Sequence, residues 1–187
     1  MRHPERIDYP VEVLARAARV RLIGFDVDGT LTDGGLHYDA HGGESKRFHV
    51  QDGLGLVLLR RAGIATALVS ARRSEATLAR GRELGIDHLH LGEQDKLGCL
   101  RRIAAERGLG LDEVAFMGDD LPDLPVLRAV GLAIAPANVH PWLRADVHWI
   151  TALAGGEGAV RQACDLLLHA QGRIEAPRHS RPAQPNT

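Results

Sequence analysis

The sequence has few cysteines, few aromatic residues and no excess of either charge. Two cysteines in 187 residues, Cys99 and Cys164, cannot form a disulfide framework, so buried thiols in a reducing cytosol are expected. Aromatic residues make up 4% of the chain, which argues against a stacking platform for single-stranded nucleic acid. Lys and Arg number 23 against 24 Asp and Glu, so no global positive field attracts a polyanion.

Long apolar runs are also absent. No run approaches the roughly 18 residues of a membrane-spanning helix, and the first 20 residues lack the apolar centre of a secretory signal. We therefore expect no membrane partner, no nucleic-acid partner and a cytoplasmic location. The length and the 44% of hydrophobic residues predict a single domain over residues 1–172. The proline-containing tail, 173–187, is expected to be disordered.

Short apolar runs alternate with amphipathic stretches along the chain. The apolar runs predict buried strands at 21–25, 64–69, 88–91, 114–117, 132–135 and 147–150. The amphipathic stretches predict helices at 10–20, 53–61, 74–84, 96–107, 121–130 and 157–170. This alternation predicts an α/β fold, with a mainly parallel sheet covered by helices on both faces. Ligands of such sheets bind at the carboxyl ends of the strands.

One polar segment, residues 34–50, breaks the alternation. It contains Gly42-Gly43 and predicts a β-hairpin with strands at 36–38 and 46–50. The hairpin follows the first strand directly, so we expect it to project over the carboxyl end of that strand. Lys46 and Phe48 either close over a site there or pack within the hairpin.

Two carboxylates follow the first predicted strand, in the sequence Asp26-Val27-Asp28-Gly29-Thr30. In extended backbone, residues i and i+2 point to the same side, so Asp26 and Asp28 can reach one bound ion. Gly29 then permits the chain to turn away. A polar turn after a strand is the plainer interpretation of this motif alone.

Three further polar groups stand beyond later strands. Ser70 ends the second core strand, Lys96 opens the helix after the third, and Asp119 follows the fourth. The carboxyl ends of parallel strands meet at one edge of the sheet, so these groups are expected to converge. Asp120 and Asp123 extend the acidic cluster, either through water or as direct ligands.

These four segments resemble, in order, the four motifs of the haloacid dehalogenase superfamily of phosphohydrolases. The resemblance spans residues 21–151 and implies a Rossmann-like three-layer α/β/α fold with Mg²⁺-dependent phosphoryl transfer. It makes Asp26 the nucleophile that takes the phosphoryl group, and Asp28 the general acid and then the base. Ser70 and Lys96 would bind the phosphoryl oxygens. Asp26, Asp119 and the backbone carbonyl of Asp28 would hold Mg²⁺.

The chemistry requires these residue types. Attack of a carboxylate on a phosphate monoester brings two anions together, and Mg²⁺ with Lys96 would offset the repulsion. An all-oxygen site suits Mg²⁺. The histidines are scattered and none pairs with a cysteine at zinc-ligand spacing.

The spacing of the motifs leaves no room for a cap domain, and a finer resemblance covers nearly the whole chain. It is to the family of 3-deoxy-D-manno-octulosonate 8-phosphate phosphatases, uncapped tetrameric enzymes of lipopolysaccharide sugar synthesis. The segments that carry the resemblance are 31–34, 43–55, 118–126, 140–141 and 155–172. It implies a homotetramer in which the part beginning at Gly155-Gly156 helps cover an active site. From the sequence alone, these glycines are a turn into the last helix.

The resemblance also implies a pocket for a phosphorylated sugar acid. Besides Asp28 and Lys96, the residues it assigns to substrate are His49, Val50, Gln51, Asp52, Gly53, Arg72 and Arg80. A carboxylate is well matched by the guanidinium fork of Arg72, while Arg80 would otherwise be a solvated helix residue.

Three departures from the family pattern stand out, namely Thr30, Ser70-Ala71 and Val57. Ser70 keeps the hydroxyl of the more usual threonine, but Val57 replaces a basic residue that helps bind substrate in many members. Two alternatives stay open. One is a phosphatase for a nine-carbon keto sugar acid 9-phosphate, and the other is a non-catalytic module that serves to oligomerise.

Overall fold

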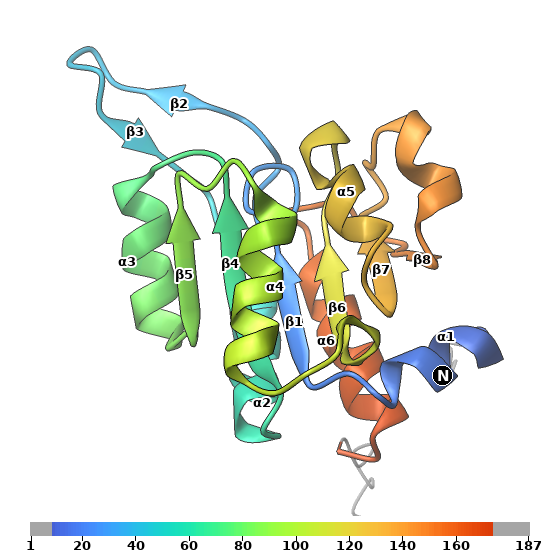
Figure 1. The fold of residues 1–187 in the computed structure, drawn as a ribbon. Helices are drawn as coiled ribbons and strands as arrows, with labels where there is room; N and C mark the ends of the chain where they lie inside the picture. Colours follow the sequence, from blue (N-terminus) through green and yellow to red (C-terminus); the bar gives the residue numbers. More distant parts are fainter. Residues whose placement is uncertain (1–8, 174–187) are drawn as a thin grey trace, which may run out of the picture.

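A six-stranded parallel sheet forms the centre of the structure, which is a computed structural model and describes residues 9–173 (Figure 1). The strands follow the order β5-β4-β1-β6-β7-β8, and every neighbouring pair is parallel. Their bounds are β1 Leu22–Phe25, β4 Ala65–Ser70, β5 His88–Leu91, β6 Val114–Met117, β7 Leu132–Ala135 and β8 Trp149–Ile150. The prediction of a mainly parallel sheet is confirmed, and β1 lies at its centre.

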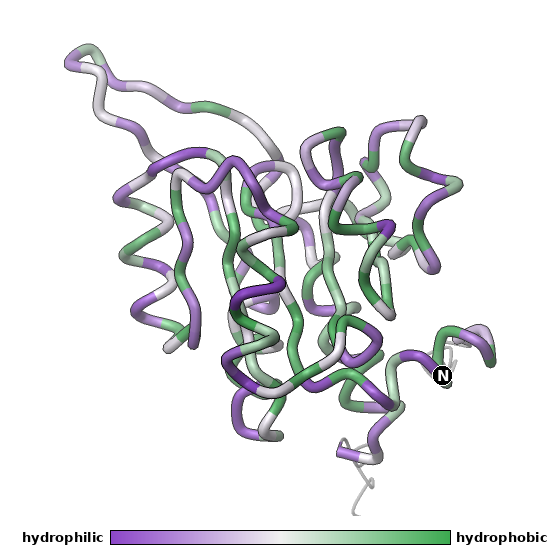
Figure 2. Tube along the Cα trace, viewed as in Figure 1, coloured by the Kyte–Doolittle hydropathy of each residue, from purple (hydrophilic) through white to green (hydrophobic). Residues whose placement is uncertain are grey.

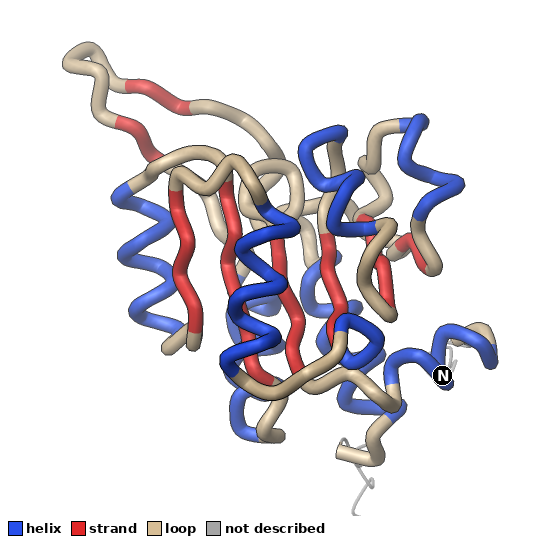
Figure 3. The backbone as a smooth tube through the Cα atoms, viewed as in Figure 1, coloured by secondary structure: helices blue, strands red, loops and turns tan. Residues whose placement is uncertain are grey.

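Helices cover both faces of the sheet (Figures 1 and 3). Their bounds are α1 Val11–Ala17, α2 Val50–Arg61, α3 Glu75–Leu84, α4 Lys96–Glu106, α5 Leu124–Leu127 and α6 Ala159–Ala170. Three short 3₁₀ turns lie at Leu111–Glu113, Leu121–Asp123 and Pro141–Asp146. None of the helices that the structure describes is long and apolar enough to span a membrane.

Successive strand residues point into two separate cores, because side chains alternate across a sheet. In β1, Ile23 and Phe25 pack with α1, α2 and α6, while Leu22 packs with α4 and α5 on the other face. All four β1 residues are fully buried, so the strand reads as a continuous apolar run. Figure 2 shows hydrophobic residues along the central strands and polar residues on much of the outer surface of the helices.

Two helices, α3 and α4, begin at the edge of the sheet where the strands end. The hydroxyl of Ser74 accepts the N–H of Thr77 at 3.4 Å and begins α3. The carboxylate of Asp95 accepts the N–H of Gly98 at 2.8 Å and begins α4, which makes Lys96 its first residue.

The hairpin is present, but its second strand lies elsewhere than predicted. It pairs β2 His37–Tyr38 with β3 Glu44–Ser45, whereas the strand was predicted at 46–50. The Asp39 carboxylate accepts the N–H groups of His41 and Gly43, both at 2.8 Å. These bonds tighten the turn, so pairing starts immediately after it and Val50 is left to begin α2.

The helix predicted over 121–130 is also interrupted. A 3₁₀ turn over Leu121–Asp123 precedes the single turn of α5, and Pro125 in the first turn of α5 has no N–H that could bond back to the 3₁₀ turn. The strands predicted at 88–91, 114–117 and 132–135 occur with the predicted ends, and the remaining predicted helices and strands occur with shifted ends. The predicted tail, apart from Arg173, lies outside the described residues.

Candidate active site

Acidic residues from two neighbouring strands converge at the carboxyl end of the sheet. Asp26 continues β1 and donates its N–H to the carbonyl of Met117, the last residue of β6, at 2.9 Å. Asp119 lies two residues after β6, and Asp123 lies in the 3₁₀ turn that follows. One carboxylate oxygen from each of the three aspartates lies within 4.8 Å of the others.

The three carboxylates of this cluster are close together, and their negative charges are not fully compensated by positive charge. Burial, followed by the charge of Asp123, raises the pKa of Asp26 to about 6. Burial, followed by the charge of Asp26, raises the pKa of Asp119 to about 7. A hard divalent cation such as Mg²⁺ takes carboxylate oxygens as ligands and would stabilise the ionised forms, so the donor set fits such an ion.

Lys96 lies beneath the cluster and joins two of its members. Its Nζ is 2.8 Å from Oδ1 of Asp26 and 2.7 Å from Oδ1 of Asp123. The Lys96 side chain is only 3% exposed and that of Asp123 is fully buried. Burial alone would lower the pKa of Lys96, but the charges of Asp123 and Asp26 outweigh it, so the pKa is raised.

The Asp123 carboxylate also accepts hydrogen bonds from the backbone. Its Oδ2 accepts the N–H groups of Asp119 at 3.0 Å and of Asp120 at 3.3 Å. Of the two aspartates that the sequence left open, Asp123 joins the cluster, while Asp120 is exposed and accepts the N–H of Leu121 at 2.7 Å.

Thr30 and Gly29 support Asp119 from the loop after β1. The Thr30 hydroxyl donates to Oδ1 of Asp119 at 3.0 Å. Gly29 has a φ of 85°, and a Cβ on it would lie 2.1 Å from Oδ2 of Asp119. From the sequence, Thr30 stands out only as a departure from a family pattern, and its hydroxyl beside two aspartates is the available signal.

Asp28 faces the hairpin instead of the other carboxylates. Its Oδ1 pairs with the ammonium of Lys46, whose side chain is 1% exposed, and its Oδ2 is 3.5 Å from Nε of Arg72. Lys46 also lies 3.4 Å from Oε1 of Glu44. Lys46, the residue after β3, therefore points into the site beyond β1, whereas β2 and β3 themselves extend outward on the side of β5 and α3 (Figure 1).

Arg72 is held by the hairpin. Its Nη2 lies 2.7 Å from Oε2 of Glu44 and donates to the Tyr38 hydroxyl at 3.0 Å. Hydrogen bonds from the Ser74 hydroxyl and from Arg72 lower the pKa of Glu44 to about 2. Sequence reasoning missed Glu44 and Tyr38, because nothing local places hairpin strand residues against a residue 28 or 34 positions later.

Ser70 is buried at the end of β4, where its hydroxyl accepts the N–H of Arg72 at 3.2 Å. It thus shares the carboxyl edge of the sheet with Asp26 and Asp119, as expected from its place in the sequence.

The segment 49–53 divides into exposed and buried residues. Val50 and Gln51 are exposed at the start of α2, and His49 is half-buried. Asp52 is 1% exposed, and its Oδ1 accepts the N–H of Arg161 at 2.7 Å, in the first turn of α6. The structure therefore places Asp52 as a contact between two helices, and it is not one of the three aspartates of the carboxylate cluster.

Arg80 lies beside Gly53, where a Cβ would come within 2.3 Å of its guanidinium. Its Nη1 is 2.9 Å from Oε2 of Glu83. In the part of the chain that the structure describes, Arg80 makes no ion pair with the carboxylate cluster.

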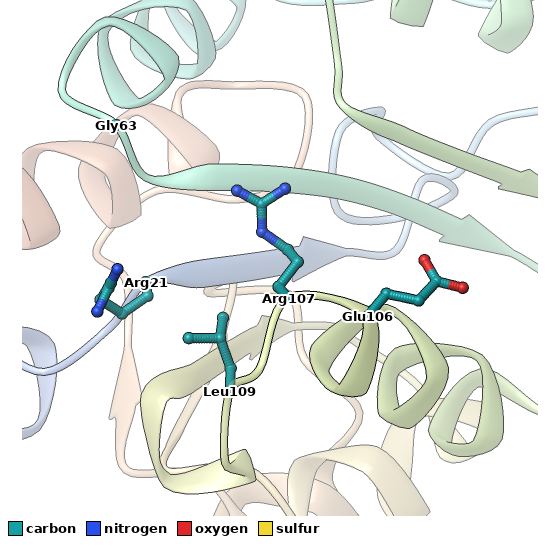
Figure 4. Close-up of a pocket in the computed structure, with 5 residues that line it drawn as sticks. All are labelled: Arg21, Gly63, Glu106, Arg107 and Leu109. Atoms are coloured by element: carbon teal, nitrogen blue, oxygen red, sulfur yellow. The ribbon is translucent and has the colours of Figure 1, made fainter.

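Three hollows in the surface lie at the opposite end of the sheet from the carboxylate cluster. One of about 310 Å³ is lined by Arg21, Gly63, Glu106, Arg107 and Leu109 (Figure 4). These residues precede β1 and β4 or end α4, so none belongs to the carboxylate cluster. The arginines lie near the carboxyl ends of helices, where positive charge is favourable.

The positions of these residues at the carboxyl end of the sheet are typical of one class of protein. A central β1 that ends in Asp-x-Asp, a buried lysine and an acidic loop after the neighbouring strand are the parts of a haloacid dehalogenase-type hydrolase. A solved hydrolase of that superfamily from Legionella pneumophila, described as putative, is 44% identical, with a TM-score of 0.85 over 87% of this chain and 89% of the other.

The chain belongs to the 3-deoxy-D-manno-octulosonate 8-phosphate phosphatase family. It is 42% identical to the family member KdsC of Yersinia pestis over 164 residues, which cover 88% of each chain. The solved 3-deoxy-D-manno-octulosonate 8-phosphate phosphatase of Moraxella catarrhalis, in complex with magnesium, phosphate and KDO, is also 42% identical. Its TM-score is 0.84, over 86% of this chain and 92% of that one. No family model matches the chain.

Proposed function

We propose that this protein is a Mg²⁺-dependent phosphatase that hydrolyses 3-deoxy-D-manno-octulosonate 8-phosphate to KDO and phosphate. The observation that carries the proposal is the buried cluster of Asp26, Asp119 and Asp123 with Lys96, in a chain 42% identical to a relative crystallised with magnesium, phosphate and KDO. Such a reaction belongs to lipopolysaccharide sugar synthesis in the cytoplasm.

Asp26 is the nucleophile in this proposal. Lys96 holds one of its oxygens at 2.8 Å, which orients the carboxylate for attack on phosphorus. The P–O bond to the sugar breaks as the Asp26–phosphorus bond forms, and the leaving sugar oxygen takes a proton from Asp28. Asp28 then accepts a proton from the water that hydrolyses the aspartyl-phosphate.

Asp26, Asp119 and the backbone carbonyl of Asp28 would hold Mg²⁺, with Asp123 within reach as a further ligand. The ion would neutralise charge on the phosphoryl oxygens. Lys96 and the Ser70 hydroxyl would bind the remaining oxygens.

The sugar acid would lie under the hairpin. Arg72 is the residue best placed for its carboxylate, because its guanidinium already binds a carboxylate, that of Glu44. The segment 49–53 and Arg80 would contribute through the exposed start of α2. An uncapped site of this kind would be completed by neighbouring copies in a homotetramer.

The experiment measures phosphate release from a panel of phosphates, with Mg²⁺ and with EDTA. The panel holds octulosonate 8-phosphate, a nonulosonate 9-phosphate and ordinary hexose phosphates. We expect metal-dependent preference for the eight-carbon acid. Asp26→Asn should abolish release, while Asp112→Asn, an exposed aspartate remote from the site, should not. Preference for the nine-carbon acid would keep the mechanism and change the substrate. An Asp26→Asn protein with full activity would refute the mechanism.

A further inference from the structure

The loop that carries the catalytic carboxylates is fastened by a side chain far away in the sequence. Asn138 lies in the loop after β7, and its Nδ2 donates to the carbonyl of Gly29 at 2.9 Å. Its Oδ1 accepts the N–H of Gly155 at 2.7 Å. One amide group therefore bridges the loop after β1 and the segment before α6.

Backbone bonds complete the connection. The N–H of Gly156 donates to the carbonyl of Thr30 at 3.2 Å, and the N–H of Ala137 donates to the carbonyl of Leu153 at 3.0 Å. The N–H of His140 donates to the carbonyl of Asp119 at 2.8 Å. Both sides of the metal cluster, the loop after β1 and Asp119, are thus tied to residues 137–140.

The two glycines make this approach possible. A Cβ on Gly155 would lie 1.9 Å from the carbonyl oxygen of Gly29. Gly156 has a φ of 69°, and a Cβ there would lie 2.6 Å from the N atom of Asp33. The sequence indicated only a turn at Gly155-Gly156, whereas the structure packs its backbone directly on the loop after β1.

We propose that Asn138 is a positioning residue for the metal cluster and, resting on the proposed function, for phosphoryl transfer. By holding the Gly29 carbonyl, it fixes the backbone between Asp28 and Thr30. That backbone includes the predicted carbonyl ligand, and it places the Thr30 hydroxyl on Asp119. Loss of the amide leaves the ligands present and lets their spacing vary.

A matched control exists at the other end of the molecule. The Gln171 side chain donates to the carbonyls of Ala17 at 3.2 Å and of Val20 at 2.8 Å. Gln171→Ala, like Asn138→Ala, removes an amide that makes two hydrogen bonds to backbone. We expect both variants to melt at similarly reduced temperatures, and a merely structural role for Asn138 predicts that they also behave alike in every other assay.

The deciding measurement is the Mg²⁺ concentration that gives half-maximal protection against thermal unfolding, starting from protein in EDTA. Asn138→Ala should raise it about 10–100-fold, as loss of residues that orient metal ligands does, and lower kcat more than it changes KM. Gln171→Ala should leave the Mg²⁺ concentration and kcat as in the wild type. Gly155→Ala should weaken Mg²⁺ protection in the same direction as Asn138→Ala.

Equal Mg²⁺ protection of Asn138→Ala and Gln171→Ala would overturn the proposal, even if Gly155→Ala fails to fold. The proposed function fails separately, through a wild-type protein that releases phosphate from no member of the panel. In that case the Mg²⁺ titrations still compare the two amides.

Discussion

Removal of the Lys96 ammonium is expected to destabilise the folded protein strongly. In Lys96→Met, the carboxylates of Asp26 and Asp123 lose their shared partner at 2.8 and 2.7 Å. Asp123 is fully buried and keeps only its two bonds from backbone N–H groups. Breaking a buried pair by removing one partner costs about 3–5 kcal/mol, which is a large part of a typical domain's stability.

Urea unfolding at pH 8 in EDTA measures the effect. Arg128→Met is the control, because Arg128 pairs with Asp146 on the surface with a side chain 61% exposed, where loss of the pair should change stability little. The double variant Lys96→Met/Asp123→Asn should recover part of the loss, since the most buried uncompensated charge is gone. The loss should also shrink on acidification, because Asp26 without Lys96 takes up a proton more readily.

Two outcomes would refute this reasoning. One is a Lys96→Met protein destabilised no more than Arg128→Met. The other is an equal cost of Lys96→Met in the wild-type and Asp123→Asn backgrounds, which would mean that the two side chains do not interact in the folded protein.

Two further results are expected. In EDTA, the unfolding free energy of the wild type minus that of the Asp26→Asn/Asp119→Asn variant should rise as the pH falls from 8 to 5. The reason is that Asp26 and Asp119 have pKa values of about 6 and 7 in the folded protein and about 4 in the unfolded chain. Between these values the folded protein binds more protons than the unfolded chain, so acidification stabilises it. A pH-independent difference would contradict this reasoning. Arg72→Ala should raise KM for the sugar-acid phosphate, and for an aryl phosphate far less. The rise should stay below the roughly tenfold or more that a full charged hydrogen bond of about 1.5–3 kcal/mol gives, because the guanidinium exchanges the Glu44 carboxylate for that of the substrate. The exposed neighbour variant Arg73→Ala should leave both KM values unchanged, and equal effects of Arg72→Ala on both substrates would remove Arg72 from carboxylate recognition.

The sheet could be predicted because its strands are buried on both faces. A strand such as β1, with four buried residues in a row, produces an apolar run that ends where the polar loop begins. The order of Asp26, Ser70, Lys96 and Asp119 along the chain then indicated which loops meet, since parallel strands bring their carboxyl ends to one edge.

The contacts between those loops could not be predicted in the same way. Glu44 meets Arg72 across 28 positions, and Asn138 meets Gly29 across 109. Such pairs depend on how the hairpin and the loop after β7 are oriented. The periodicity of hydrophobic residues along the sequence carries no information on that orientation. The position of the second hairpin strand was missed for a related reason, because backbone N–H groups bound to the Asp39 carboxylate set the start of pairing.

The contact between Arg72 and Glu44 makes binding at this guanidinium an exchange. Under the proposed function, an incoming carboxylate competes with the Glu44 carboxylate for Nη2 of Arg72, and Glu44 stays ionised because its pKa is held at about 2. The net gain in affinity is the difference between two similar charged hydrogen bonds, so it is smaller than that of a free arginine. The same exchange operates in reverse, since Glu44 can retake Arg72 as a bound sugar acid departs. Under the proposed function, the hairpin would thereby favour departure of the product over tight retention, because the product carries the same carboxylate as the substrate.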